Sequence, residues 1–215
     1  MVKIAIMVGG PESYLPDIKN RLLDNVIWIG VDRGAIRLLD YGIKPVLALG
    51  DFDSITSEEL SHLRNKIRDV RQFPAEKDAT DTELAVRVAF EEFTPEEVTL
   101  YGATGGRLDH LLNNLWLVFQ PAFYPHLSKI KIIDNKNTVS YFKPGVYEIQ
   151  KETDKKYLAF VCLTAVRELT LKDMKYELSK ANIAYPQSLA SNEFITKNAK
   201  FSFETGLVSV IQSKD

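Results

Sequence analysis

The stretch Val46-Leu47-Ala48-Leu49-Gly50-Asp51-Phe52-Asp53-Ser54 passes from an apolar run into an acidic turn. Four consecutive apolar residues followed by glycine and aspartate are typical of a short strand that is buried on both faces. Side chains alternate along an extended chain, so Asp51 and Asp53 are expected to point the same way at its carboxyl end. Carboxylates in such a place are costly unless a cation accompanies them. The stretch therefore predicts a parallel sheet with a charged site at its edge.

Similar apolar runs occur elsewhere in the first 120 or so residues, and segments with helical periodicity separate them. The expected strands are residues 4–8, 26–29, 46–49 and 98–101, and the expected helices are residues 14–24, 34–41, 57–67, 81–93 and 107–119. Strands that alternate with helices indicate an α/β fold, with a mostly parallel, Rossmann-like sheet covered by helices on both faces. Such sheets bind ligands beyond the carboxyl ends of their strands.

The pattern changes after the segment 121–125, and no helical periodicity is visible beyond about residue 130. Short alternating segments follow instead, and they indicate antiparallel strands. Thr205-Gly206 is the predicted turn of a final hairpin. We therefore predict two domains, an α/β domain at residues 1–128 and an antiparallel β domain at residues 129–215.

The composition is that of a globular protein. Of 215 residues, 45% are hydrophobic and 26% are charged, and the formal net charge is −2. No block of lysine or arginine suggests nucleic acid as a partner, and no segment reaches membrane-spanning length. The single cysteine, Cys162, excludes an internal disulfide and is expected to be buried and inert. The first residues are typical of a strand and not of a signal peptide, so the expected location is the cytoplasm.

A second acidic cluster covers residues 78–83. Thr80 and Glu83 fit a capping box at a helix start, which is a structural interpretation of those two residues. That interpretation does not involve Asp81, which could act as a metal ligand or hold metal-bound water. Lys77 could supply positive charge for a phosphate. Ser54, after the first cluster, is the expected cap of the next helix.

A glycine turn at residues 102–107 leads from an expected strand into a helix. Gly105 and Gly106 would let the backbone approach an anion at the helix start, and Arg107 would add a guanidinium for a phosphate, although a plain tight turn is the alternative. Asp109, close to the same edge, could orient a substrate amine or hydroxyl. The sequence has no lysine-bearing phosphate loop, no strand-bound Gly-x-Gly-x-x-Gly and no protein-kinase motif set.

In order and spacing, these motifs resemble the bacterial-type thiamine pyrophosphokinase family. The matching segments are residues 30–35, 50–54, 77–83, 105–110 and 191–194. The resemblance implies an N-terminal α/β domain that binds ATP and Mg²⁺ and a C-terminal β-sandwich that binds thiamine and takes part in dimerisation. It also implies a homodimer whose active sites are shared between subunits.

The resemblance carries residue roles with it. It implies Mg²⁺ ligation by Asp51, Asp53 and Asp81 with Asp32 close by, cofactor contacts by Asp32, Ser54, Lys77, Thr80, Gly105, Gly106 and Arg107, and thiamine contacts by Asp109, Tyr176, Ser191 and Asn192. Asp51, Asp53, Asp81, Arg107 and Asp109 form the implied catalytic set. One departure concerns residue 173, where this chain has aspartate and the family often has glycine.

The implied reaction is attack of the thiamine hydroxyl on the β-phosphorus of ATP, with release of AMP. Such a transfer depends on charge neutralisation and in-line placement. Either Asp53 or Asp81 would take the hydroxyl proton. Two rival functions stay open at this point. One is a haloacid-dehalogenase-like phosphatase with Asp51 as nucleophile and Asp53 as acid/base, and the other is a sensor that binds nucleotide or thiamine without catalysis.

Overall fold

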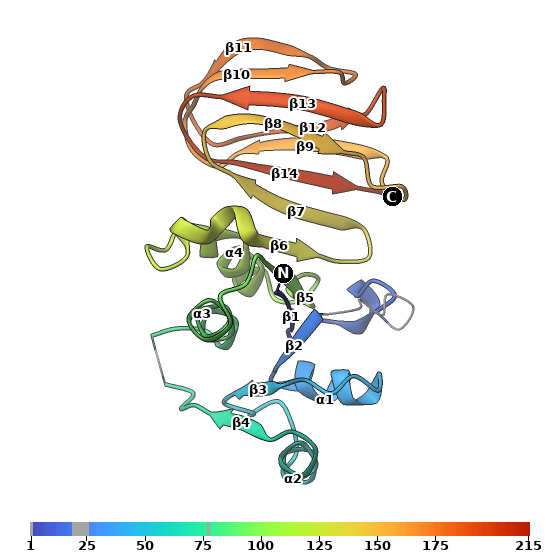
Figure 1. The fold of residues 1–215 in the computed structure, drawn as a ribbon, viewed down its shortest axis with the longest axis vertical. Coiled ribbons are helices and arrows are strands. Elements are labelled where there is room, and N and C mark those ends of the chain that lie inside the picture. Colours follow the sequence, from blue (N-terminus) through green and yellow to red (C-terminus); the bar gives the residue numbers. More distant parts are fainter. Residues whose placement is uncertain (1, 19–25, 77) are drawn as a thin grey trace. The chain divides into compact units, whose positions relative to one another are not determined.

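The computed structural model describes residues 2–18, 26–76 and 78–215 (Figure 1). The chain divides into two compact units, residues 1–135 and 136–215. The division therefore falls a few residues after the expected one at 128/129. The reason is that strand β6 (Ile130–Ile133) pairs in parallel with β5 (Glu97–Tyr101) of the first unit.

The first unit contains a parallel sheet with the strand order β6-β5-β1-β2-β3-β4. Its remaining strands are β1 (Lys3–Met7), β2 (Val26–Val31), β3 (Leu47–Gly50) and β4 (Asp69–Gln72). The strands expected near 4–8, 26–29, 46–49 and 98–101 are thus confirmed within one or two residues. Strand β4 was not predicted, because it is polar and pairs only with β3, so no apolar run marks it.

Four α-helices accompany this sheet: α1 (Arg33–Asp40), α2 (Ser57–Lys66), α3 (Asp81–Phe93) and α4 (Leu108–Trp116). The short 3₁₀ helices are η1 (Glu12–Tyr14), η2 (Leu117–Phe119) and η3 (Tyr124–Lys129). Both α1 and α3 pack on β1 and β2, and Figure 1 shows them on opposite sides of those strands. The α/β architecture with helices on both faces is confirmed.

Two helix predictions differ from the structure. The helix expected at 14–24 is not formed at residues 15–18, and residues 19–25 lie outside the described part of the chain. The cap of α2 is Thr56 and not Ser54. The Thr56 hydroxyl accepts a hydrogen bond from the Glu59 N–H and the Glu59 carboxylate accepts one from the Thr56 N–H, which completes a capping box.

The second unit is an antiparallel β-sandwich, as expected. One sheet has the order β12-β9-β14-β7 and the other β11-β10-β13-β8. The strands are β7 (Asn137–Phe142), β8 (Gly145–Gln150), β9 (Tyr157–Cys162), β10 (Val166–Lys172), β11 (Leu178–Ile183), β12 (Gln187–Glu193), β13 (Asn198–Phe203) and β14 (Val208–Ser213). The predicted final hairpin at Thr205-Gly206 is wrong, because β13 and β14 belong to different sheets and this segment connects the two.

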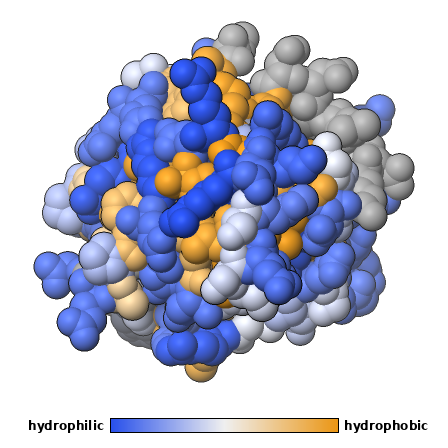
Figure 2. Space-filling view, turned by 90° about the horizontal axis from the view of Figure 1, so that it is seen from below, coloured by the Kyte–Doolittle hydropathy of each residue, from blue (hydrophilic) through white to orange (hydrophobic). Residues whose placement is uncertain are grey.

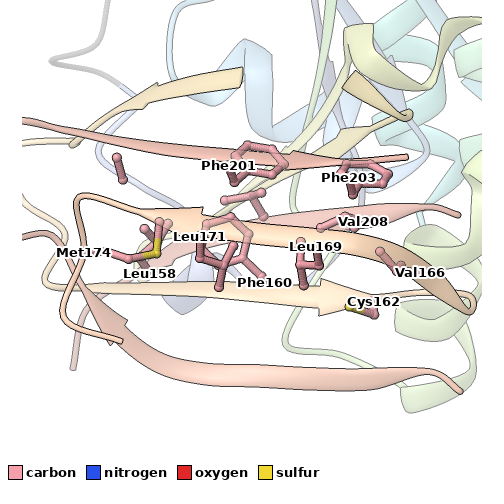
Figure 3. Packing of buried hydrophobic residues seen from close by; sticks show 12 residues of the cluster. Leu158, Phe160, Cys162, Val166, Leu169, Leu171, Met174, Phe201, Phe203 and Val208 are labelled. Atoms are coloured by element: carbon pink, nitrogen blue, oxygen red, sulfur yellow. The ribbon is translucent and has the colours of Figure 1, made fainter. Parts of the chain in front are cut away.

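The core of the sandwich comes from alternate residues of its strands (Figure 3). In β9, Leu158, Phe160 and Cys162 are completely buried, and the residues between them are partly exposed. Burial in this apolar core raises the pKa of the Cys162 thiol, so the thiolate is disfavoured. The expectation of a buried cysteine is confirmed.

Polar residues dominate the face of the molecule that Figure 2 shows, and smaller hydrophobic areas lie between them. Within residues 2–18, 26–76 and 78–215, no helix has the length and apolar character needed to cross a bilayer.

Candidate active site

A cavity of about 800 Å³ lies at the carboxyl ends of the parallel strands of the first unit. Its walls are segments that directly follow β1, β2, β3 and β5, together with the amino ends of α1, α3 and α4. Strand β1 is the point at which the strand order reverses, since β2 lies on one side of it and β5 on the other. Ligands of open α/β sheets bind at such a crevice.

Three carboxylates converge in this cavity. Asp32 follows β2, Asp51 follows β3, and Asp81 is the first residue of α3. One oxygen from each lies within 4.8 Å of the other two. All the donors are carboxylate oxygens, the ligands that hard cations such as Mg²⁺ prefer, so the residues present fit that ion.

The backbone around the acidic cluster is built to bring Asp32 close to the end of β3. Asp32 and Phe52 both have positive φ, at 46° and 60°, and the Phe52 N–H donates to Asp32 Oδ1 at 3.1 Å. At Gly50, an added Cβ would lie 1.8 Å from the same Asp32 oxygen. Only glycine therefore allows the carboxylate to lie against this strand end. Strained conformations of this kind persist where the surrounding structure enforces them.

Burial and charge repulsion together determine the electrostatics of the cluster. The pKa of Asp32 is raised from 3.8 to about 7, first because burial separates the carboxylate from water and next because Asp81 is close. Asp51 and Asp53 raise it further, whereas the hydrogen bond from Phe52 lowers it. A bound cation would remove the repulsion, and the site is therefore electrostatically suited to one.

Asp53 lies beside this cluster and not in it. It lines the same cavity, and its N–H donates to Asp51 Oδ1 at 3.0 Å. The carboxylates that converge are thus Asp51 and Asp81 of the predicted metal set together with Asp32, which was expected close to the metal but not as a ligand. Metal ligation by Asp53 stays a prediction.

The glycine turn forms another wall of the cavity. Gly106 and Arg107 line it, while Gly105, at φ 79°, packs on the ring of Tyr14, where a Cβ would come within 2.4 Å. Arg107 donates to Asp109 from Nη2 at 2.6 Å and from Nε at 3.2 Å. Both side chains are largely exposed, and the guanidinium lowers the pKa of Asp109. Asp109 thus pairs with the group predicted to bind phosphate.

Two cationic residues of the cavity were missed in the sequence, namely Arg33 and Arg37 on α1. Arg33 donates to the carbonyl oxygen of Ser54 and, at 3.4 Å, to Glu59. Ser54 therefore serves, through its backbone, to fix the acidic loop against α1. The signal was present, because Arg33 directly follows Asp32 at a helix start, where anions bind. Lys77 lies outside the described residues.

The residues predicted to contact thiamine in the second unit lie together. Tyr176 is 57% exposed, and its backbone is held by Asn192, which accepts from the Tyr176 N–H at 2.9 Å and donates to the Tyr176 carbonyl at 2.8 Å. Asn192 is buried. Ser191 has φ 61° at an irregularity of β12. Asp173, the residue at which the sequence departs from the expected motif, has φ 61°, a conformation that favours glycine.

The parallel sheet with a cavity at its switch point and an adjacent glycine turn defines an α/β protein of the kind that binds nucleotides, and the acidic cluster in the cavity fits a divalent cation. Two family models match the chain. The thiamin pyrophosphokinase catalytic domain matches residues 18–133, and the thiamin pyrophosphokinase vitamin B1 binding domain matches residues 146–208. The chain belongs to the thiamine pyrophosphokinase family.

Individual relatives agree over the whole length. Thiamine pyrophosphokinase of Bacillus subtilis is 39% identical over 217 residues, which covers 100% of each chain. The crystal structure of a thiamin pyrophosphokinase family protein from Enterococcus faecalis has a TM-score of 0.94 at 46% identity, covering 99% of each chain. The Bacillus subtilis enzyme structure has a TM-score of 0.89 at 38% identity, again covering 99% of each chain.

Proposed function

We propose that this chain transfers a diphosphate group from ATP to the hydroxyl of thiamine, giving thiamine diphosphate and AMP. The observation that carries the proposal is the convergence of Asp32, Asp51 and Asp81 at the switch point of the sheet, in a chain of this family. A triphosphate brings high negative charge, and a site of carboxylates can accept it only together with cations. A cation bound between the acidic cluster and the nucleotide would neutralise charge on both.

Asp32, Asp51 and Asp81 would hold Mg²⁺, with Asp53 adjacent. When bound, Mg²⁺ neutralises charge on the phosphate oxygens. Arg107 at the mouth of the cavity would bind phosphate oxygens, which requires that it leave its pair with Asp109. That exchange would release the Asp109 carboxylate for thiamine.

Catalysis would depend on placement and electrostatics more than on covalent help. The thiamine hydroxyl attacks the β-phosphorus, its proton passes to a carboxylate, either Asp53 or Asp81, and AMP leaves with the bridging oxygen. Neither carboxylate needs a nucleophilic role. We place Asp53 first, since it lines the cavity outside the three converging ligands.

We assign the thiamine ring to the exposed Tyr176 and to Ser191 of the second unit, with Asn192 holding Tyr176 in place. A homodimer with shared active sites and a cytoplasmic location complete the proposal. Mixing an inactive Asp51→Asn chain with an inactive Ser191-site chain tests the sharing. Hybrid dimers should recover part of the activity, and no recovery in verified hybrids would mean that each subunit builds its whole site.

The reaction itself is tested by incubating the purified protein with thiamine and Mg-ATP and separating the products by chromatography. Thiamine diphosphate and AMP in equal amounts are expected. ADP with thiamine monophosphate would show a simple kinase, and binding without turnover would show a sensor. Release of inorganic phosphate from a phosphate ester would support the phosphatase alternative, which the family membership does not favour.

A further inference from the structure

Helix α4 is fixed to two walls of the cavity by neighbouring asparagines. Asn113 Nδ2 donates to the hydroxyl oxygen of Thr80 at 3.2 Å, and Asn114 Nδ2 donates to the carbonyl oxygen of Ala103 at 2.9 Å. Thr80 is the cap of α3, directly before Asp81, and Ala103 belongs to the glycine turn. The side-chain amide of Asn113 thus contacts the hydroxyl of Thr80, and Thr80 is also a lining residue of the cavity.

The Thr80 hydroxyl accepts two hydrogen bonds. Besides the one from Asn113, it accepts one from the Glu83 N–H at 3.3 Å, as the capping box requires. A hydroxyl has two acceptor positions and one hydrogen to donate. Because both acceptor positions are used, Thr80 can engage a ligand in the cavity only as a donor.

The capping box itself is held from outside α3. Glu83 is 4% exposed, its Oε2 accepts from the Thr80 N–H at 2.9 Å, and its Oε1 accepts from the side-chain amide of Gln120. Thr80 is therefore held by Asn113 and, at two points, by Glu83, and it also lines the cavity.

We propose that Asn113 is a positioning residue that keeps the Thr80 hydroxyl hydrogen directed at a phosphate oxygen of the bound nucleotide. This inference rests on the proposed function. A phosphate oxygen accepts hydrogen bonds and cannot donate them, so a hydroxyl that faced it with a lone pair would repel it. The neutral amide of Asn113 prevents this arrangement, because its N–H₂ group donates to the lone pair of the Thr80 hydroxyl that would otherwise face the phosphate.

Asn113→Asp tests this directly, since aspartate has nearly the same shape but an ionised carboxylate cannot donate. The Thr80 hydroxyl hydrogen would turn toward the new carboxylate and leave the nucleotide without its donor. Binding of a non-hydrolysable ATP analogue with Mg²⁺ should weaken by about tenfold or more in calorimetry. Asn65→Asp, on the exposed side of α2, adds the same charge elsewhere and should bind as the wild type.

A double-mutant cycle separates the hydroxyl effect from the added charge. Thr80→Val should itself weaken analogue binding about tenfold. In the Thr80→Val background, Asn113→Asp should then cause a clearly smaller loss than in the wild type, and that remaining loss reports the added charge alone. An equal loss from Asn113→Asp with and without the Thr80 hydroxyl would overturn the inference, and so would unchanged binding in the single variant.

Asn113→Ala replaces Asn113→Asp in the same cycle if the aspartate variant melts well below the wild type. Alanine cannot donate to the Thr80 hydroxyl, whose hydrogen can then point in more than one direction, so the affinity for the analogue should fall a few-fold. This loss of affinity should vanish in the Thr80→Val background. Persistence of the loss there would contradict the inference. A wild-type chain that does not bind the analogue would instead contradict the proposed function.

Discussion

The cavity of the first unit and the Tyr176 region of the second unit differ in how their polar groups are compensated. In the cavity, three carboxylates converge within 4.8 Å, and the pKa of Asp32 rises to about 7. In the second unit, the buried amide of Asn192 satisfies both backbone groups of Tyr176 and also accepts from the Glu193 N–H. The first region brings together three negatively charged groups, whereas the central group of the second region is a neutral amide.

The difference bears on the roles proposed for the two regions. Repulsion among half-buried carboxylates is relieved when one of them binds a proton or when a cation binds, so the first region suits a cationic ligand. The neutral amide of Asn192 has its hydrogen-bond partners within the protein and needs no ligand. The second region is therefore a preformed structure that exposes the ring of Tyr176. Changes in the first region should therefore alter activity most, and changes in the second should alter stability and thiamine affinity.

The largest effect is expected from removing a carboxylate of the cavity. Asp51→Asn and Asp53→Asn should each lower turnover by about a thousandfold or more, because a neutral amide cannot replace the lost charge. Asp51→Asn should also raise the melting temperature without Mg²⁺, since it reduces repulsion. Steady-state kinetics and thermal unfolding measure both. A well-folded Asp53→Asn chain with near-normal turnover would remove Asp53 from the catalytic set.

The second prediction concerns Asn192. Asn192→Ala would leave the N–H and the carbonyl of Tyr176 without their partner, at a cost of about 2 kcal/mol in the free energy of unfolding. The KM for thiamine should rise more than the KM for ATP. Denaturant unfolding and kinetics test this, with Asn182→Ala in β11 as a control for a more exposed asparagine. Equal changes in both KM values would mean that Asn192 does not act through the thiamine site.

The third prediction is a dependence on pH. The folded pKa of Asp32, about 7, exceeds the unfolded value of 3.8, so the folded chain binds the extra proton between these values. Without Mg²⁺, this group makes stability fall as pH rises from about 4 to 7. Mg²⁺ competes with that proton, so it should raise the melting temperature more at about pH 8 than at about pH 5. Asp32→Asn should abolish the difference, and an equal Mg²⁺ effect at both pH values would disprove it.

The smallest effect is expected at Asp173, whose φ of 61° suits glycine. Asp173→Gly removes backbone strain but also the contact with Lys200 at 3.5 Å, and both are small. The free energy of unfolding should change by less than about 1 kcal/mol. Asp173→Val should destabilise by about 1–2 kcal/mol, because a β-branched residue tolerates this conformation poorly. Equal stability of both variants in urea would show that the strain is absent.

Local patterns in the sequence determined most of the elements and the chemical character of the cavity. Apolar runs that end in glycine or aspartate mark β2, β3 and β5 and place the acidic residues at strand ends, since hydrophobic burial and strand geometry act over a few residues. The capping box of Thr80 and Glu83 is local as well, and the structure confirms it. The two-part fold follows from the change of periodicity near residue 130.

Only the tertiary structure decided which groups meet. Asp32 and Asp81 are 49 positions apart, and no local rule places both beside Asp51 in preference to Asp53. Pairing between strands also decided that polar β4 is an edge strand and that the segment at Thr205-Gly206 connects two sheets. Such choices depend on contacts between segments distant in the chain, whose free energy is shared over the whole fold and is not encoded in any short stretch.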